Sequence, residues 1–513
     1  MPSTAYRSMH TRQLFWVALL AIPLSLFFGL IASSGNTVVI FLFTGLLGGL
    51  ILVSQPTMLL WFTLIWTLLV AGPLSYFANV SRADWIVYAS AFVFWFIAGI
   101  SAFSSSKKSP HQEVSKFPGY LVALILFYIL NLANSLYQLD GVMQLFVGIK
   151  NYFLFFGLTL TLAAAVFSIN TLRRVAVGIL IIGLIQLPVA LYQFIFIRSD
   201  RIDSGGGTIG DSLVEASDVV VGTMGGQVLR GGLDDVLALL SPILLAGLLT
   251  AWRQNLLPTG RTIALSILVI APVFLTETKV IFFYFPVVAL VVSWDYLRRR
   301  PHALAMTALV APLVLAVGLA GYYQLHWSKQ YENIEVAVEK SFTYSFAEQA
   351  GEARARSSGE MTRREAVEYW WTNHDLSQPD TLFLGHGLAA SKQQSTVVLP
   401  KTVREHGGRN LAKTGLSQLL WDAGLIGTLL FFGVLLAASH RAAKLSQTGE
   451  PMDRVILKAI QAGLLLMALS LLYRSSLLNT AQAGFPLFLM LGMVAYYDRF
   501  AKKSALSESG VKG

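Results

Sequence analysis

The residues of this chain that are best suited to chemistry are basic side chains beside long apolar runs. Lys279 and Arg230 stand out, because a single charge at the end of an apolar segment is costly unless it faces a cavity or a partner. Arginine can bind two phosphate oxygens at once and lysine adds a compact charge, so a group of them would suit a phosphate or pyrophosphate. Any one of them could instead extend to lipid head groups without a specific role. The other residues of this kind are Arg198, Arg201, Arg363, Arg364, Arg404, Arg409 and Arg474.

A second set of candidates lies in the stretch REHGGRN, residues 404–410, directly before another long apolar run. His406 is a candidate general base, because neutral imidazole is the usual proton acceptor near neutral pH, and Glu405 is the alternative. A loop histidine without a chemical role is an equally open interpretation. Asn410 fits the N-cap of the apolar helix that is expected to begin at residue 411.

Other polar motifs in the sequence give weaker support for a functional site. The glycine-rich stretch GTMGGQVLRGG, which begins at Gly222, follows no expected strand, so it fits neither a dinucleotide-binding motif nor a P-loop. Adjacent Asp234 and Asp235 point in different directions on a helix, and the chain contains no cysteine, so we expect no metal site. Glu277 near Lys279 could form a salt bridge or support proton-coupled transport, which keeps a transporter as an alternative.

The composition indicates that the chain that positions these residues is a membrane protein. Of the 513 residues, 55% are apolar and only 13% are charged, and the mean hydropathy is +0.62. Such a chain is expected to form an all-α, polytopic transmembrane helical bundle. The net charge of +10 comes largely from short basic clusters between apolar runs, which indicate membrane topology and argue against a nucleic-acid partner.

Apolar windows of about 18 to 22 residues, each long enough to cross a bilayer, recur about fourteen times along the chain. We expect transmembrane helices 1 to 11 within residues 1–323, a large extracytoplasmic (periplasmic) loop with short helices at 324–410, and helices 12 to 14 with a cytoplasmic tail at 411–513. The windows lie near 14–32, 37–54, 57–77, 85–103, 117–137, 145–168, 175–197, 233–252, 262–276, 279–297, 302–323, 411–438, 455–473 and 481–498.

One helix of the large loop is predicted near residues 361–373, where it would lie on the outer membrane surface. Thr362 and Glu365 have the spacing of a capping box, which marks a helix start. Trp370 and Trp371 would suit the level of the lipid head groups.

The distribution of basic residues predicts the orientation of the spans. With residue 1 in the cytoplasm and all windows crossing, every short basic cluster falls on the cytoplasmic side. A single long helix over residues 262–297 would send Arg298 to Arg300 to the opposite side, so two spans are predicted there. Both termini are therefore expected in the cytoplasm, and the candidate residues face the other side.

Five stretches between residues 230 and 427 resemble the conserved elements of a known family in their order and spacing. They are RGGLDDVLALLSPILLAGLL from residue 230, LTETKVIFFYFPVVAL from 275, TRREAVEYWW from 362, TLFLGHGLAAS from 381 and RNLAKTGLSQLLWDAGLIG from 409. The arrangement resembles the bacterial O-antigen ligase and O-antigen polymerase superfamily. Its members are polytopic glycosyltransferases that act on undecaprenyl-pyrophosphate-linked glycans.

The resemblance implies an enzyme that transfers such a glycan en bloc to an acceptor hydroxyl on the outer face of the bacterial inner membrane. Polymerisation of O-antigen or exopolysaccharide repeat units is favoured over O-antigen ligation to lipid A core, because of the large number of expected spans. A polytopic transporter or lipid-linked oligosaccharide flippase is the alternative of another class. The implied partners are the lipid-linked donor, a glycan or lipid acceptor, membrane lipids and a chain-length regulator, with no cofactor and no metal.

The resemblance also implies roles for particular residues. His406 would act as base or orient the acceptor, with Glu405 as its substitute. The family commonly has histidine directly before the asparagine of the last piece, whereas Arg409 precedes Asn410 here and His406 lies one helical turn earlier. The residues implied to bind the donor pyrophosphate are Arg230, Lys279, one of Arg363 and Arg364, and Arg409.

Overall fold

The computed structural model describes residues 53–80, 82–105, 117–198, 208–209, 212–213, 219–227, 231–276, 278–298, 300, 302, 316–328, 332–339, 361–392 and 399–510. The chain divides into two compact units, Met1–Leu59 and Leu60–Gly513. In the first, the described residues include the start of the helix that begins at Pro56. The second contains the remaining elements.

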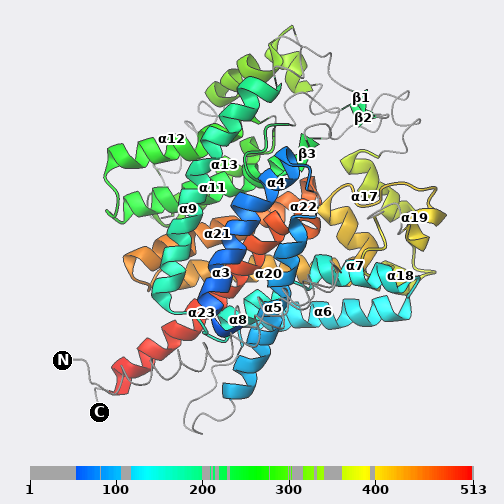
Figure 1. Cartoon of the computed structure of the whole chain (residues 1–513), viewed down its shortest axis with the longest axis horizontal. Coiled ribbons are helices and arrows are strands. Elements are labelled where there is room, and N and C mark those ends of the chain that lie inside the picture. Colours follow the sequence, from blue (N-terminus) through cyan, green and yellow to red (C-terminus); the bar gives the residue numbers. More distant parts are fainter. Residues whose placement is uncertain are drawn as a thin grey trace, which may run out of the picture. The chain divides into compact units, whose positions relative to one another are not determined.

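Regular structure in these residues is almost entirely helical, as the sequence predicts (Figure 1). Two short antiparallel strand pairs are the exception: β1 (Thr208–Ile209) with β2 (Ser212–Leu213), and β3 (Gly226–Gln227) with β4 (Gly231–Gly232). The helices are α3 (Pro56–Ile65), α4 (Ala71–Phe77), α5 (Asp84–Ser105), α6 (Gly119–Tyr137), α7 (Val142–Tyr152), α8 (Phe156–Ala163), α9 (Ile169–Tyr192), α11 (Asp234–Arg253), α12 (Thr259–Leu275), α13 (Ile281–Leu297), α17 (Arg363–Thr372), α18 (Pro379–Leu384), α19 (Lys401–Glu405), α20 (Gly415–Leu445), α21 (Pro451–Tyr473), α22 (Ser476–Asn479) and α23 (Ala481–Gly510), with π-helical turns η1 (Trp66–Val70), η2 (Gln193–Ile197) and η4 (Tyr323–Trp327).

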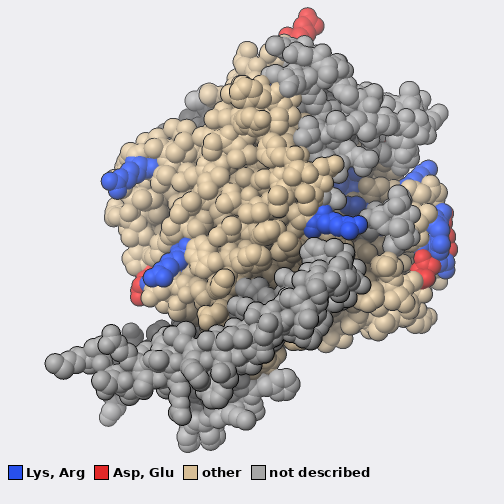
Figure 2. Space-filling view, in the orientation of Figure 1, with Lys and Arg blue, Asp and Glu red and all other residues tan. Residues whose placement is uncertain are grey.

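Within the described residues, 7 helices are long and apolar enough to cross a membrane, and the pair α7 and α8, bent by 43°, would make an eighth. Few charged side chains interrupt the face shown in Figure 2, as expected of a surface in lipid. The chain is therefore a helical, multi-pass membrane protein. The window at 14–32, nearly all of 37–54 and most of 302–323 lie outside the described residues, so the total of about fourteen spans stays a prediction.

The stretch 262–297 contains two separate helices. α12 ends at Leu275 and α13 begins at Ile281, and each has 17 residues. Glu277, in the connection between them, lies outside the described residues. The stretch is therefore not one continuous helix, whereas crossing of the membrane by both helices stays a prediction, because each is shorter than the 7 candidate spans.

Helix α11 is the most deeply packed of the candidate spans, with 78% of its apolar window buried. It contacts α12, α13 and α21, and α20 in turn packs on α21 and α6. Asp234 at the start of α11 lies beside Arg474 after the end of α21, while Arg253 and Arg454 meet at the opposite ends of the same two helices. α11 and α21 are therefore antiparallel, and the segments that join the helices gather at two ends.

The helix predicted in the large loop is present as α17, and its capping box is confirmed. The Thr362 hydroxyl accepts from the Glu365 amide at 3.2 Å, and the Glu365 carboxylate accepts from the Thr362 amide at 2.6 Å. The expected head-group position of Trp370 is wrong, because its side chain is 1% exposed and packs against Trp421 in a separate hydrophobic core. Trp371, on the other side of the helix, is 68% exposed.

The predicted N-cap at Asn410 is also wrong. Helix α20 begins at Gly415, and Thr414 caps it by accepting a hydrogen bond from the Ser417 amide at 3.0 Å. Leu411 is fully buried in the core that contains Trp370, so the chain must pass through this core before it can enter the helix. Tertiary packing therefore outweighs the local preference of asparagine for a helix start.

Candidate functional site

Basic residues from separate segments converge at the C-terminal end of α21. Arg474 forms a salt bridge with Asp234 at 3.3 Å. Thr278 donates a hydrogen bond to the same carboxylate. Arg363, the first residue of α17, donates from Nε to the Tyr473 carbonyl at 2.9 Å, and its guanidinium lies 4.0 Å from the centre of the Tyr473 ring. We call these five residues the Arg474 cluster.

The predicted phosphate-binding residues fall in different places relative to this cluster. Arg363 belongs to it, and Lys279 directly follows Thr278. Arg364 instead pairs with Glu368 one turn along α17, with 46% and 48% of the two side chains exposed, so it is part of an ordinary helix-surface pair. Arg230 lies outside the described residues.

A second group of polar residues surrounds Trp421 in α20. The ring centres of His374, His386 and His406 lie 4.8, 5.5 and 4.8 Å from that of Trp421. We call these three residues the histidine cluster. His406 reaches it from the turn after α19, and its Nδ1 lies 3.0 Å from the Tyr369 hydroxyl.

Hydrogen bonding determines the tautomers of two of these histidines. His374 Nδ1 lies 2.8 Å from the Trp370 carbonyl, which can only accept, so Nδ1 carries the proton. In the neutral ring His374 Nε2 is then an acceptor, and His386 Nε2, 2.9 Å away, must donate to it. The Nδ1 of His386 is therefore left without a proton.

The environment keeps all three histidines neutral near physiological pH. Burial, followed by the nearby His374, lowers the pKa of His386 to about 4. Burial also lowers the pKa of His374 and the pKa of His406. A neutral imidazole can accept a proton, so the histidine cluster can provide general-base chemistry.

The other two predicted residues of this region have different surroundings. Arg409 places its guanidinium 5.2 Å from the centre of the Tyr369 ring, so it lies next to the hydroxyl that contacts His406. Glu405 pairs with Lys401 at 3.7 Å, and the side chains are 56% and 65% exposed. His406 is therefore better placed for chemistry than Glu405.

The loop after α18 holds His386 against α20 through backbone hydrogen bonds. The His386 amide donates to the Trp421 carbonyl at 2.8 Å. The buried Asp422 carboxylate accepts from the Tyr152 hydroxyl at 2.8 Å and from the Ser391 amide at 2.9 Å. α20 is broken at Gly424, where φ is 63° and ψ is −168°, and this break admits the loop. Asp422 is thus an anchor of the loop and not a surface carboxylate.

Two lysines lie near the same loop. Lys392 follows the anchored segment, and burial and then the charge of Lys150 lower the pKa of its amino group. Lys150, near the end of α7, places its ammonium 4.8 Å from the centre of the Tyr88 ring. Neighbouring Asn151 contacts Asn479 at 3.3 Å. This end of the bundle therefore carries cationic groups besides those of the Arg474 cluster.

The sequence alone did not point to His374, His386, Lys150 or Lys392. His386 lies between Gly385 and Gly387 in the stretch TLFLGHGLAAS, and nothing in that stretch marks the histidine as functional. A usable signal was that three of the 8 histidines fall within residues 374–406. Among the residues that the structure describes, no group of three or more His, Asp or Glu side chains is arranged to hold a metal ion.

Comparison of the sequence with models of known protein families and with curated proteins finds no match. The fold defines the class of the molecule as a helical membrane protein.

Proposed function

We propose that the protein is a membrane glycosyltransferase that transfers an undecaprenyl-pyrophosphate-linked glycan en bloc to an acceptor hydroxyl. The supporting observation is the meeting of Arg363 and Arg474 beside the segment that holds Lys279. These residues come from three regions that are far apart in the sequence. Arginine and lysine at one site match the several anionic oxygens of a pyrophosphate.

The reaction requires that the enzyme stabilise the charge on the leaving pyrophosphate and orient the acceptor hydroxyl. The acceptor oxygen attacks the anomeric carbon of the donor glycan, and the bond from that carbon to the pyrophosphate oxygen breaks. Undecaprenyl pyrophosphate leaves with the bonding electrons, and Arg363, Arg474 and Lys279 would stabilise the negative charge that develops on it. These contacts are stronger at the edge of a membrane protein than in water, because the effective dielectric constant is lower.

The histidine cluster supplies the base for the acceptor. Arg363 begins α17 and Tyr369, which contacts His406, lies six residues later, about 9 Å along the helix axis. Arg363 and the residue that contacts His406 therefore lie on the same short helix, within two turns of each other. His406 would take the proton from the acceptor hydroxyl, and His386 and His374 hold the aromatic surroundings in place.

The proposed reaction has two forms, which differ in the acceptor. We favour polymerisation of O-antigen or exopolysaccharide repeat units, in which the acceptor is a second lipid-linked glycan. Ligation to lipid A core is the alternative, with the same donor. In both cases the protein would lie in the bacterial inner membrane, with both termini in the cytoplasm and the site facing the periplasm.

A transporter or lipid-linked oligosaccharide flippase is the second candidate, and one observation favours it. α20 is broken at Gly424 and α7 is bent against α8 by 43°. Interrupted membrane helices are common at the binding sites of transporters. In the present chain the break admits the loop that carries His386, which gives it a structural purpose without transport.

The experiment uses the full chain, purified in detergent and incubated with synthetic undecaprenyl-pyrophosphate oligosaccharide. We expect longer lipid-linked glycans, detected by mass spectrometry of the lipid products. Transfer only to added lipid A core would favour the ligase, and an unchanged donor with every acceptor would reject the glycosyltransferase. Movement of intact donor across a vesicle membrane would favour the flippase.

Adjacent arginines provide a matched pair of variants for this assay. Arg363→Ala removes a member of the Arg474 cluster and should lower turnover by about a hundredfold or more, a typical loss for a residue that stabilises developing charge. Arg364→Ala removes the same charge from the neighbouring position, where the side chain is half exposed and paired with Glu368. We expect it to keep activity close to that of the wild type, and equal losses in both variants would contradict the proposed site.

A further inference from the structure

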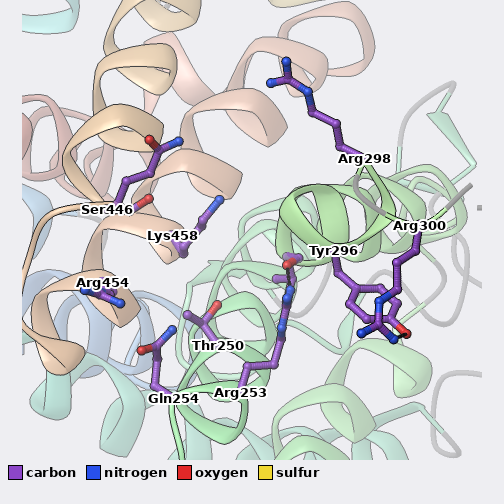
Figure 3. A pocket seen from close by; sticks show the side chains of 11 residues that line it. Thr250, Arg253, Gln254, Tyr296, Arg298, Arg300, Ser446, Arg454 and Lys458 are labelled. Carbon is purple, nitrogen blue, oxygen red and sulfur yellow. Dashed lines mark hydrogen bonds between the residues drawn. The ribbon is translucent and has the colours of Figure 1, made fainter. Parts of the chain in front are cut away.

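A large cationic cavity lies at the end of the bundle away from the Arg474 cluster. Its volume is about 820 Å³, and it is lined by the C-terminal ends of α11, α13 and α20 and by the start of α21 (Figure 3). The lining residues labelled in Figure 3 come from three parts of the chain: the end of α11, the end of α13, and the end of α20 with the start of α21. The cavity therefore lies between the ends of several helices.

The wall of the cavity is strongly basic. The five basic residues are Arg253, Arg298, Arg300, Arg454 and Lys458. No acidic side chain is among the described residues that line it. The acidic residues at the start of α21, Glu450 and Asp453, are bound by Arg173 at 2.6 and 2.8 Å. Concentrated positive charge of this kind is costly and favours an anionic ligand.

Several of these guanidinium groups are held in place with donors left over. Arg253 donates one N–H to the Val292 carbonyl, and Arg454 donates from Nε to the Gly449 carbonyl at 2.7 Å. Arg300 lies over the Tyr296 ring, 5.0 Å from its centre. Each guanidinium has five N–H donors, so these contacts orient the group and leave further N–H groups for phosphate oxygens.

The surface around the cavity has the character of a membrane interface. Trp252, directly before Arg253, is 44% exposed, and Trp294 on α13 is 50% exposed. Exposed tryptophan is typical of the level where lipid head groups meet the acyl chains. Ile263 and Ile267 on neighbouring α12 are 56% and 61% exposed and provide an apolar surface beside that level. An anion that binds in the cavity would therefore lie at head-group depth.

We propose that this cavity binds the phosphate head group of an anionic phospholipid, whose acyl chains lie along the exposed apolar surface of α12 and α13. A basic pocket between helix ends at the membrane surface is a recurring site for acidic lipids. The bound lipid links α11, α13 and α21, whose opposite ends form the Arg474 cluster. The site is distinct from that cluster and does not depend on the glycosyltransferase proposal.

The test measures lipid binding by the purified, delipidated full chain with native mass spectrometry. The ligands are phosphatidylglycerol, phosphatidylcholine with the same acyl chains, and inorganic phosphate. At physiological salt we expect phosphatidylglycerol to bind at least about tenfold more tightly than phosphatidylcholine, and inorganic phosphate to bind more weakly than either. Inorganic phosphate that competes as tightly as phosphatidylglycerol would overturn the lipid assignment.

Variants locate the site. The double variant Arg298→Gln with Arg454→Gln should weaken phosphatidylglycerol binding by about a hundredfold, roughly tenfold for each charge-assisted contact. Arg261→Gln is the matched control, because this exposed arginine near the start of α12 is not among the residues that line the cavity. It should change binding less than about twofold.

Unfolding in the absence of lipid separates binding from folding. The double variant and the control should melt at similar temperatures, and replacement of the same two arginines by lysine should restore part of the binding because the charge is kept. Wild-type affinity in the glutamine double variant, or an equal loss in Arg261→Gln, would overturn the proposal.

Discussion

Replacement of Gly424 by alanine tests the break in α20 on which the loop after α18 depends. Gly424 has φ 63° and ψ −168°, a conformation that residues with a Cβ adopt only at a cost. A Cβ at this position would lie 2.5 Å from the carbonyl carbon and oxygen of Phe383. Both are backbone atoms at the end of α18, so they cannot rotate out of the way as a side chain could.

Two costs and one gain set the size of the expected effect. The backbone conformation costs about 1 to 3 kcal/mol for a residue other than glycine. Displacement of packed atoms costs about 1 to 3 kcal/mol more. Replacement of glycine by alanine returns about 0.5 to 1 kcal/mol from the unfolded chain. The free energy of unfolding should therefore fall by about 1 to 5.5 kcal/mol, and the upper part of this range is expected because the Phe383 backbone cannot relax without moving α18.

Gly433→Ala is the control on the same helix. A Cβ at Gly433 would meet no atom within 4 Å, so we expect a small gain in stability instead. The measurement is the free energy of unfolding of both variants, from titration with SDS in mixed micelles, with tryptophan fluorescence as a second readout near Trp421. If Gly424→Ala is as stable as Gly433→Ala, the close approach of the loop to α20 is refuted.

Three further perturbations test the surroundings of this loop. Tyr152→Phe removes the hydroxyl that donates to Asp422 and should cost about 1.5 to 3 kcal/mol of unfolding free energy, measured in the same titration. Burial holds the pKa of His386 at about 4 against an ordinary value of 6.5, so the unfolded chain binds more protons between these values and stability should fall as pH drops from about 6.5 towards 4. His386→Gln should remove roughly 3 kcal/mol of that decrease, as a pH series of unfolding titrations would reveal. Arg364→Ala should change stability by less than about 0.5 kcal/mol, because exposed pairs within a helix contribute little.

Local signals in the sequence were sufficient for much of the helical structure. Apolar windows found α5, α6, α11 and α21, because helices in lipid must be apolar along their whole length. The capping box at Thr362 found the start of α17, because its two hydrogen bonds need only residues within one turn. Features that depend on neighbours in sequence are readable without a structure.

Features that depend on tertiary contacts were not readable. Tryptophan is a residue type that is common at the membrane interface, yet Trp370 is buried because α17 packs on the start of α20. Asn410 has the chemistry of an N-cap, yet Leu411 next to it is drawn into the same core. The histidine cluster likewise forms only where three loop segments meet on Trp421. No periodicity or spacing could have brought these rings together.

The two basic regions of the molecule differ in how their charge is balanced, and the difference suits different ligands. Arg474 forms a salt bridge with Asp234, which neutralises part of its charge. The described wall of the opposite cavity contains no acidic side chain. A site of unbalanced arginines would hold undecaprenyl pyrophosphate after the reaction as tightly as during it, and turnover would stop. At the proposed glycosyltransferase site, partial neutralisation by Asp234 would weaken binding of the released pyrophosphate and so allow it to leave. A lipid bound in the opposite cavity, as proposed, would have no need to leave, and the five basic side chains of its described lining suit such a ligand.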